Sequence, residues 1–374
     1  MSRKPRVLFV GRTRYRLPLD RSLERKFDAL AAELQIRVLG SAQADSPLSS
    51  STFRLVRRRR PGFMDGALFY LWLPRLVAEE LRRFEPQAVI TQSVYEAAAV
   101  FAAKRLAGSD ARVVVDVHGD WDTATDLYGS GTRRLLAPLT TRVSRYAVRR
   151  ADGVRTISEF TTRRVRREGV EPASVFPAYV DLTTFNTTPP KALPSAARAL
   201  FVGVLERYKN VDGLAAAWRL VAARAPDARL LVVGSGRERE TIERLVADVS
   251  GVQWRERLSP AEVAAALDDS TLLVLPSRSE GLPRIVIEAF CRGRPVVGTR
   301  AGGIPDIVED GVNGLLVPAG EDGALAAALL QLLGDRSLQE RLAEGAHASA
   351  AAWLQTPEQF AAQVRDLVER VAGV

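Results

Sequence analysis

The sequence predicts an α/β protein built from two doubly wound, Rossmann-like domains. Apolar runs of strand length alternate with amphipathic helical segments along most of the chain, which is typical of parallel sheets covered by helices. The alternation occurs twice, and residues 186–196, which contain Pro189, Pro190 and Pro194, separate the two series as an interdomain linker. At 374 residues the chain is also long for one domain. We therefore expect one domain at 1–190 and a second at 197–356.

The first series starts with the apolar run at 7–10, which predicts a buried strand that is followed by Gly11. The run at 112–117 is strongly apolar and is followed by His118, Gly119 and Asp120. Ligands of doubly wound sheets bind at the carboxyl ends of the strands, so both places are candidate sites. Further strands are expected at 36–39, 88–91, 153–156 and 175–177. Helices are expected at 21–34, 68–84 and 95–106, with one more that ends at 150 and another that begins at 158.

The second series repeats this pattern after the proline-rich segment. The run at 199–202 ends at Gly203, and the run at 272–275 leads into a loop at 276–283. A helix is expected to start at Ile285, directly after that loop. Other strands are expected at 230–233, 251–254 and 295–298, with helices from 211, from 237 and at 260–267.

The positive charge of the chain belongs to its first half. The formal net charge is +9, and residues 1–185 hold 32 Lys and Arg against 20 Asp and Glu, with basic runs at 57–60 and 163–167. This excess favours anionic partners, either membrane headgroups or an acceptor with phosphate or carboxylate groups. Arginine enrichment from a GC-rich genome explains the charge equally well. Nucleic acid is disfavoured, because no aromatic-interleaved basic stretch accompanies the charge.

Composition and cysteine content limit the class of protein to which the chain can belong. A hydrophobic content of 47% with 26% charged residues is typical of a soluble globular chain. The early apolar runs at 7–11 and 67–73 are too short to span a bilayer, and the first has no signal-peptide cleavage context. Cys291 is the only cysteine, which excludes an internal disulfide and fits a cytoplasmic protein.

Glu280 and Glu288 are the residues that most clearly indicate the chemistry of the protein. Glu280 lies in the loop after the strand at 272–275, and Glu288 lies one to two turns into the following helix. Free backbone N–H groups and the helix dipole at that helix start favour a bound phosphate. A carboxylate on the helix can accept hydrogen bonds from nucleotide sugar hydroxyls, and one in the loop can contact a group beyond the phosphates. This arrangement suits a nucleotide-sugar.

The stretch from 276 to 318 resembles the retaining glycosyltransferases of family 4, the group 1 glycosyltransferases. Their pattern is two glutamates separated by seven residues, followed by G-x-P-V-V, G-G-x-P-[DE]-x-[IV] and D-G-x-[NT]-G-x-L-[VF] elements. Here these elements begin at Gly293, Gly302 and Asp310. The resemblance implies the GT-B fold, in which two Rossmann-like domains face each other across a cleft. It also implies that helix 357–374 packs back on the first domain.

The resemblance assigns donor binding to the second domain. Gly203 permits close approach of backbone to a ligand, and Lys209 corresponds to the lysine that contacts the donor pyrophosphate. A surface lysine is the alternative, although positive charge is unfavourable at a helix start. Many relatives carry Arg where this chain has Val204, so Arg207 is a candidate substitute. The other donor-binding candidates follow Glu280 and are Gly281, Leu282, Pro283, Arg284, Ile285 and Val286, together with Glu288.

Residues of the first domain are candidates for the reaction centre and the acceptor. Family members often have a histidine where this chain has His118, close to the transferred sugar, so we assign His118 and Glu280 as the catalytic pair. Asp120 is expected on the acceptor side, because the D-x-D form of residues 120–122 lacks a nucleotide-binding context for a metal. Gly11, Arg12 and Arg14 stand where relatives carry a glycine-rich loop, and the arginines favour an anionic acceptor.

The resemblance implies transfer of a sugar from a nucleoside-diphosphate sugar to a hydroxyl acceptor, with retention and without a metal or other cofactor. The acceptor is expected to be anionic or lipid-linked, as in cell-envelope glycolipid or polysaccharide synthesis at the inner face of the membrane. A GT-B nucleotide-sugar epimerase and a non-catalytic sugar- or membrane-binding module remain alternatives. A nicotinamide oxidoreductase is disfavoured, because the turn at Gly234 lacks the third glycine of G-x-G-x-x-G.

Overall fold

The computed structural model describes residues 4–57, 65–121 and 137–374 and divides them into two compact units. The N-terminal unit contains the described residues up to Trp121, those from 137 to Tyr179, and those from Gln355 to Val374. The C-terminal unit contains Val180–Leu354. Each unit is built around its own parallel sheet, as the alternation of apolar runs predicts.

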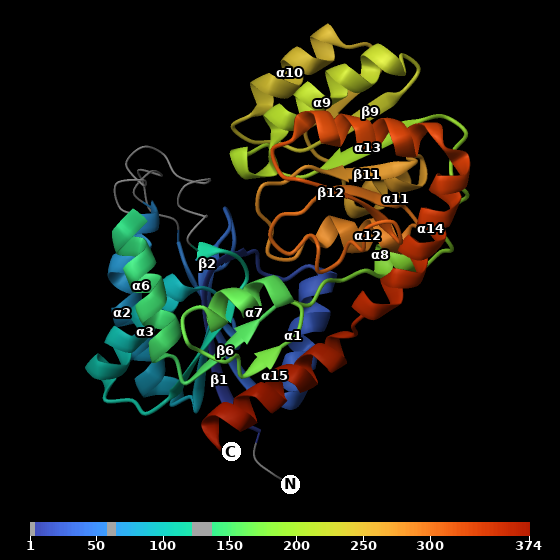
Figure 1. Cartoon of the computed structure of the whole chain (residues 1–374). Helices are drawn as coiled ribbons and strands as arrows, with labels where there is room; N and C mark the ends of the chain where they lie inside the picture. The colour runs from blue at the N-terminus through green and yellow to red at the C-terminus, as the bar shows by residue number, and fades with distance from the viewer. Residues whose placement is uncertain (1–3, 58–64, 122–136) are drawn as a thin grey trace. The chain divides into compact units, whose positions relative to one another are not determined.

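The N-terminal unit has a seven-stranded parallel sheet with the order β3-β2-β1-β4-β5-β6-β7. Figure 1 shows α2, α3 and α6 grouped on one side, with α1 and α15 lying together on the other. The strands are β1 (Arg6–Tyr15), β2 (Gln35–Ala42), β3 (Phe53–Val56), β4 (Ala88–Thr91), β5 (Arg112–Val117), β6 (Gly153–Thr156) and β7 (Ser174–Val175). The helices are α1 (Arg21–Glu33), α2 (Asp65–Phe84), α3 (Val94–Ala107), α6 (Ala137–Arg150), α7 (Glu159–Arg166) and α15 (Pro357–Ala372).

Strand β1 is longer than the sequence predicts. The apolar pattern ends at Val10, but the strand continues to Tyr15 after a register shift between Val10 and Arg14. Tyr15 is buried and packs edge-on against Phe27 and Phe53, with ring centroids 5.9 and 5.2 Å away. This aromatic contact draws the chain back to the sheet, so the expectation of a loop at Gly11–Arg14 is wrong.

Helix α15 packs on the N-terminal unit although it ends the chain. Phe360, Val364 and Leu367 are buried in the same core as Leu30 of α1. Arg365 forms an ion pair with Glu33, with 2.6 Å between nitrogen and oxygen. The last helix therefore closes one face of the first sheet.

The C-terminal unit has a six-stranded parallel sheet with the order β10-β9-β8-β11-β12-β13, which is the Rossmann strand order. Its strands are β8 (Arg198–Val202), β9 (Arg229–Val233), β10 (Val252–Arg255), β11 (Leu272–Leu275), β12 (Val296–Thr299) and β13 (Gly314–Val317). Its helices are α8 (Thr183–Asn186), η1 (Arg207–Lys209), α9 (Val211–Arg224), α10 (Arg239–Asp248), α11 (Pro260–Asp268), α12 (Arg284–Cys291), α13 (Asp322–Gly334), α14 (Arg336–Ala350) and η2 (Ala351–Trp353).

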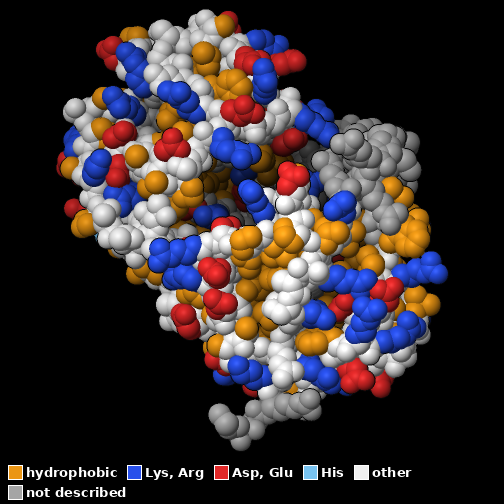
Figure 2. All heavy atoms as spheres, turned by 180° about the vertical axis from the view of Figure 1, so that it is seen from behind, with side chains coloured by type: hydrophobic (Ala, Val, Ile, Leu, Met, Phe, Trp, Pro, Cys, Tyr) orange, Lys and Arg blue, Asp and Glu red, His pale blue; other side chains and the backbone are white. Residues whose placement is uncertain are grey.

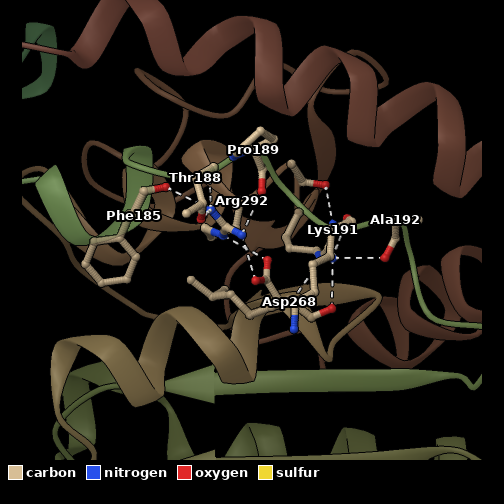
Figure 3. A network of polar contacts seen from close by, with 10 residues as sticks. Phe185, Thr188, Pro189, Lys191, Ala192, Asp268 and Arg292 are labelled. Carbon is tan, nitrogen blue, oxygen red and sulfur yellow. Dashed lines mark hydrogen bonds and ion pairs between the residues drawn. The ribbon is translucent and has the colours of Figure 1, made fainter.

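Two buried arginines fix the proline-rich segment 186–196 to the C-terminal unit. Arg292 makes two bonds to the carboxylate of Asp268, at 2.8 and 2.7 Å, and donates to the carbonyl oxygens of residues 188 and 189. Arg294 donates to the carbonyl oxygens of residues 191 and 192. Figure 3 shows these contacts along the segment. The change of unit lies between Tyr179 and Val180, earlier than the sequence predicts, because these arginines bind carbonyl oxygens along the segment and hold it to the C-terminal unit.

None of the described helices is long and apolar enough to cross a membrane. Cys291 is buried on α12, and burial raises the pKa of its thiol to about 11, which suits the packing role of a small apolar side chain. Residues 58–60 of the first basic run lie outside the described residues.

Candidate functional site

The candidate donor site lies at the switch point of the C-terminal sheet. Strands β8 and β11 are neighbours there, and the strand order reverses between them. The loops that follow these two strands therefore start side by side at the carboxyl edge, where ligands of such sheets bind. The first loop carries Gly203, Arg207 and Lys209, and the second carries Glu280.

The side chains of Lys209 and Glu280 meet between these loops. The Nζ atom of Lys209 lies 2.6 Å from Oε1 of Glu280, and the hydroxyl of Ser277 donates to the same oxygen at 2.8 Å. Both charged side chains are 11% exposed. This largely buried pair holds a cation and a carboxylate side by side where the two loops meet.

Arg278 connects the two loops, a role that no sequence motif indicates. Its backbone N–H donates to the carbonyl oxygen of Tyr208 at 2.7 Å, and its Nε donates to Asn210 at 2.9 Å. Asn210 has a left-handed backbone with φ of 56° at the end of η1. These contacts set the position of Lys209 beside the second loop.

The Gly302-Gly303 element holds the Glu280 loop from the other side. Gly302 has a φ of +57°, and a Cβ atom added there would lie 2.2 Å from the carbonyl oxygen of Glu280. The N–H of Gly303 donates to that oxygen at 2.8 Å. A glycine is required because only its backbone fits so close to the loop.

Helix α12 begins directly after this loop. Pro283 is its N-cap residue and makes no side-chain capping bond. Ile285 and Val286 are buried in the core, so only their backbone can face a ligand, whereas the side chain of Arg284 is exposed. The helix start thus offers backbone N–H groups, as an anion site needs. Gly281 and Leu282 precede it and are half-buried.

Glu288 lies buried on α12, with Nε of Arg284 2.5 Å from its Oε1. Burial raises the pKa of the Glu288 carboxyl, and the charge of Arg284 opposes this rise. The carboxylate is therefore desolvated and has one charged partner, which leaves capacity for hydrogen bonds from hydroxyl groups.

Gly203 and Arg207 complete the donor-side candidates. A Cβ added to Gly203 would lie 3.4 Å from Cε of Lys209, so the turn passes close to the lysine side chain. The Arg207 side chain is exposed on η1, and Val204 is 46% exposed. An exposed valine in this loop leaves space where a longer side chain would fit.

His118 lies in the N-terminal unit beside two charged residues that the sequence did not single out. Its Nε2 is 3.5 Å from Oδ2 of Asp116, and Arg155 donates to the same oxygen at 2.8 Å. Arg155 is 3% exposed, and its guanidinium lies 4.0 Å from the ring centroid of Phe176. Arg155 holds the pKa of Asp116 below its ordinary value against the effect of burial.

The acceptor-side candidates are spread along the carboxyl edge of the same sheet. Asp120 pairs with Nε of Arg164 at 3.3 Å. Gly11 is buried against the side chain of Gln92, Arg12 is half-buried and Arg14 is exposed. Asp122, the second acid of the D-x-D form, lies outside the described residues. In the part of the chain that the structure describes, no group of three metal-ligating side chains occurs.

Both units match models of glycosyltransferase families. Residues 21–184 match the model described as Glycosyltransferase Family 4, and residues 196–335 match the one described as Glycosyl transferases group 1. The chain belongs to the group 1, family 4 type of glycosyltransferases. This confirms the resemblance that the paired glutamates and the following motifs indicate.

Relatives and solved structures agree with this assignment. A GDP-mannose-dependent monoacylated alpha-(1-6)-phosphatidylinositol monomannoside mannosyltransferase from Corynebacterium glutamicum is 30% identical over 244 residues, 60% of this chain and 61% of that protein. The chain spans about half the length of the curated relatives it matches.

The structural neighbours are GT-B glycosyltransferases, which confirms the predicted fold class. Sucrose-phosphate synthase from Thermosynechococcus elongatus has a TM-score of 0.78 at 20% identity, covering 97% of this chain and 98% of that one. HepE from Anabaena, bound to UDP and glucose, has a TM-score of 0.69 at 19% identity, covering 96% and 98%.

Proposed function

We propose that this protein transfers a hexose from a nucleoside-diphosphate sugar to a hydroxyl acceptor, with retention of the anomeric configuration and without a metal ion or other cofactor. The contact between Lys209 and Glu280 at the switch point carries this proposal. It places a cation for phosphate and a carboxylate for sugar hydroxyls 2.6 Å apart, next to the start of α12. HepE, a structural neighbour, binds UDP and glucose, which supports the same class of donor.

The proposed roles follow from what each group can offer. Glu288 accepts hydrogen bonds from the ribose hydroxyls, while Lys209, Arg207 and the N–H groups at the start of α12 bind the two phosphates. Glu280 exchanges its bond with Lys209 for hydroxyls of the transferred sugar. His118 donates to that sugar from the first domain.

The chemical step breaks the bond between the anomeric carbon and the β-phosphate oxygen and forms a bond from that carbon to the acceptor oxygen. The acceptor hydroxyl loses its proton to the departing diphosphate. Negative charge grows on the diphosphate as the first bond lengthens, and the cationic side chains with the helix start stabilise it. Departure and attack on the same face give retention.

Donor turnover tests this proposal against its rivals. A thermal-shift screen of nucleotide-sugars first identifies a donor, since ligand binding raises the stability of the native state. Release of nucleoside diphosphate only when an acceptor is present supports transfer. Release without acceptor supports epimerisation or hydrolysis, and binding without release supports a non-catalytic module.

Substitution of the two glutamates tests the site itself. We expect Glu288→Ala to raise the donor KM strongly and Glu280→Ala to lower mainly kcat. Glu309→Ala is a matched control, because Glu309 is an exposed glutamate of the same unit. Wild-type kinetics in both site variants would contradict the assignment.

We further propose that the protein acts in cell-envelope glycolipid or polysaccharide synthesis at the inner face of the membrane. Leu71 and Trp72 on α2 are 71% and 38% exposed, and the guanidinium of Arg75 lies 5.7 Å from the Trp72 ring. Figure 2 shows hydrophobic side chains on the surface of the N-terminal unit, with Lys, Arg, Asp and Glu side chains between them. Apolar and basic side chains together favour an anionic lipid surface.

Sedimentation with liposomes tests the membrane proposal. Binding to anionic vesicles is expected at low salt, with release at high salt because ions screen the attraction. Replacing both Leu71 and Trp72 with serine should weaken it. Equal binding to neutral and anionic vesicles would contradict this part of the account.

A further inference from the structure

The N-terminal unit contains a cavity of about 350 Å³ between its sheet and the helices α1 and α15. Its walls are mostly apolar and include Phe9, Phe27, Leu30, Phe360 and Leu367. Ligand pockets in proteins start at about 300 Å³. At about 30 Å³ for each water-sized group, the cavity has room for roughly a dozen non-hydrogen atoms.

One end of the cavity is charged. Lys26, Asp116, His118 and Arg155 line it there. Arg155 donates through its two terminal nitrogens to Asp116 and to the carbonyl oxygens of residues 176 and 177, while its buried Nε has no hydrogen-bond partner. Asp116 pairs with Arg155, so the charged end keeps an excess of one positive charge whenever Lys26 is protonated.

This excess charge resides on Lys26. Its ammonium lies 5.2 Å from the ring centroid of Phe360 and 5.7 Å from that of Phe27. Within the described ranges, no carboxylate lies at ion-pair distance from it. Burial, followed by the charge of Arg155, lowers the pKa of Lys26 to about 8. A cation held among aromatic rings and beside a second cation is stabilised by an anion at its side.

We propose that this cavity is a binding site for an anionic amphiphile, whose carboxylate or phosphate pairs with Lys26 and whose apolar part of about ten carbons lies between the sheet and the helices α1 and α15. The apolar walls supply most of the affinity and the ammonium selects the charge. The opening beside His118 gives the head group access, because that side chain is 42% exposed.

Calorimetric titration of the full chain with decanoate, decyl phosphate and decanol tests the proposal. The two anions are expected to bind at least about tenfold more tightly than decanol, the difference that one charge-assisted hydrogen bond provides. The tighter of the two anions identifies the head group as carboxylate or phosphate. Equal affinity for decanol and both anions, or no binding of either anion, would overturn the proposal.

Two variants separate a specific site from general binding to apolar surface. Lys26→Met removes the charge and shortens the side chain by one atom. It should weaken the binding of decanoate by roughly tenfold and leave the binding of decanol unchanged. Arg25→Met removes an exposed charge from the adjacent position of α1 and should change neither. If both variants reduce the affinity for decanoate equally, the positive charge acts only through the overall electrostatic field of the protein, and the assignment of Lys26 is wrong.

The outcome is independent of donor binding. Nucleoside diphosphates titrated into the same samples report on the C-terminal unit, and Lys26→Met should leave their affinity unchanged. Loss of nucleotide binding with retained decanoate binding would contradict the proposed function alone. Loss of decanoate binding with retained nucleotide binding would contradict the cavity assignment alone.

Discussion

Replacing Lys26 with methionine should stabilise the protein near neutral pH, even though it removes a charged side chain from a candidate ligand site. The pKa of Lys26 falls from 10.5 to about 8, chiefly because the ammonium is buried and secondly because Arg155 lies near. One pKa unit corresponds to about 1.36 kcal/mol, so the charged lysine costs the folded state about 3 kcal/mol. The variant also loses the contacts of the ammonium with two aromatic rings, which lowers its stability by about 1 kcal/mol. Lys26→Met should therefore stabilise the folded state by about 2 kcal/mol in total.

The gain should disappear as the pH rises. Between about pH 8 and 10.5 the unfolded chain binds more protons at this lysine than the folded chain does, so the stability of the wild type increases with pH. The methionine variant lacks the group and shows no such increase. The difference between the two proteins should therefore shrink by about 2 kcal/mol from about pH 7 to about pH 9.5.

Urea unfolding at both pH values measures this difference. The two units can unfold separately, so the circular dichroism curves need one transition for each unit. Lys191→Met is the matched control, because the Lys191 side chain is exposed and belongs to the other unit. If the variant were less stable than the wild type at pH 7, or if the difference were equal at both pH values, the charged Lys26 would not destabilise the folded state.

Three further results are expected. Arg292→Met leaves the Asp268 carboxylate buried without its cation. The free energy of unfolding of the C-terminal unit, measured with urea, should therefore fall by about 3–5 kcal/mol. A fall of less than about 1 kcal/mol would contradict this. Arg207→Ala should raise the donor KM at least about threefold, and Val204→Arg in that background should recover it, whereas an unchanged KM would leave Arg207 without a role. Donor affinity should fall as the pH decreases and Glu288 becomes protonated. Because burial raises the pKa of Glu288, this fall should begin at a higher pH than it would for an exposed glutamate. Glu288→Gln should abolish this dependence on pH.

Local patterns predicted most of the strands and the donor loop, although Phe53–Val56 and Gly314–Val317 were missed. Leu272–Leu275 lies where an apolar run bounded by turn residues places it, and Gly153–Thr156 lies where a short strand is expected. The sequence also placed Lys209 and Glu280 at strand ends that the Rossmann order makes neighbours, although their roles stay predictions. These features depend on residues close together in the chain, where side-chain period and turn chemistry act directly.

Features that depend on distant contacts were missed. Asp116 and Arg155 lie inside strands, and only the pairing of β5 with β6 shows that they face each other. Arg292 and Arg294 bind a proline-rich segment about a hundred positions earlier, so its composition suggested a free linker. Tyr15 extends β1 through contacts that no local period reveals.

The structure of the protein in complex with its donor nucleotide would show whether the donor binds at the switch point of the C-terminal sheet. We predict that the ribose hydroxyls donate to the carboxylate of Glu288, and that the phosphates contact Lys209 and the backbone at the start of α12. A nucleotide bound elsewhere, with Lys209 still paired to Glu280, would contradict it.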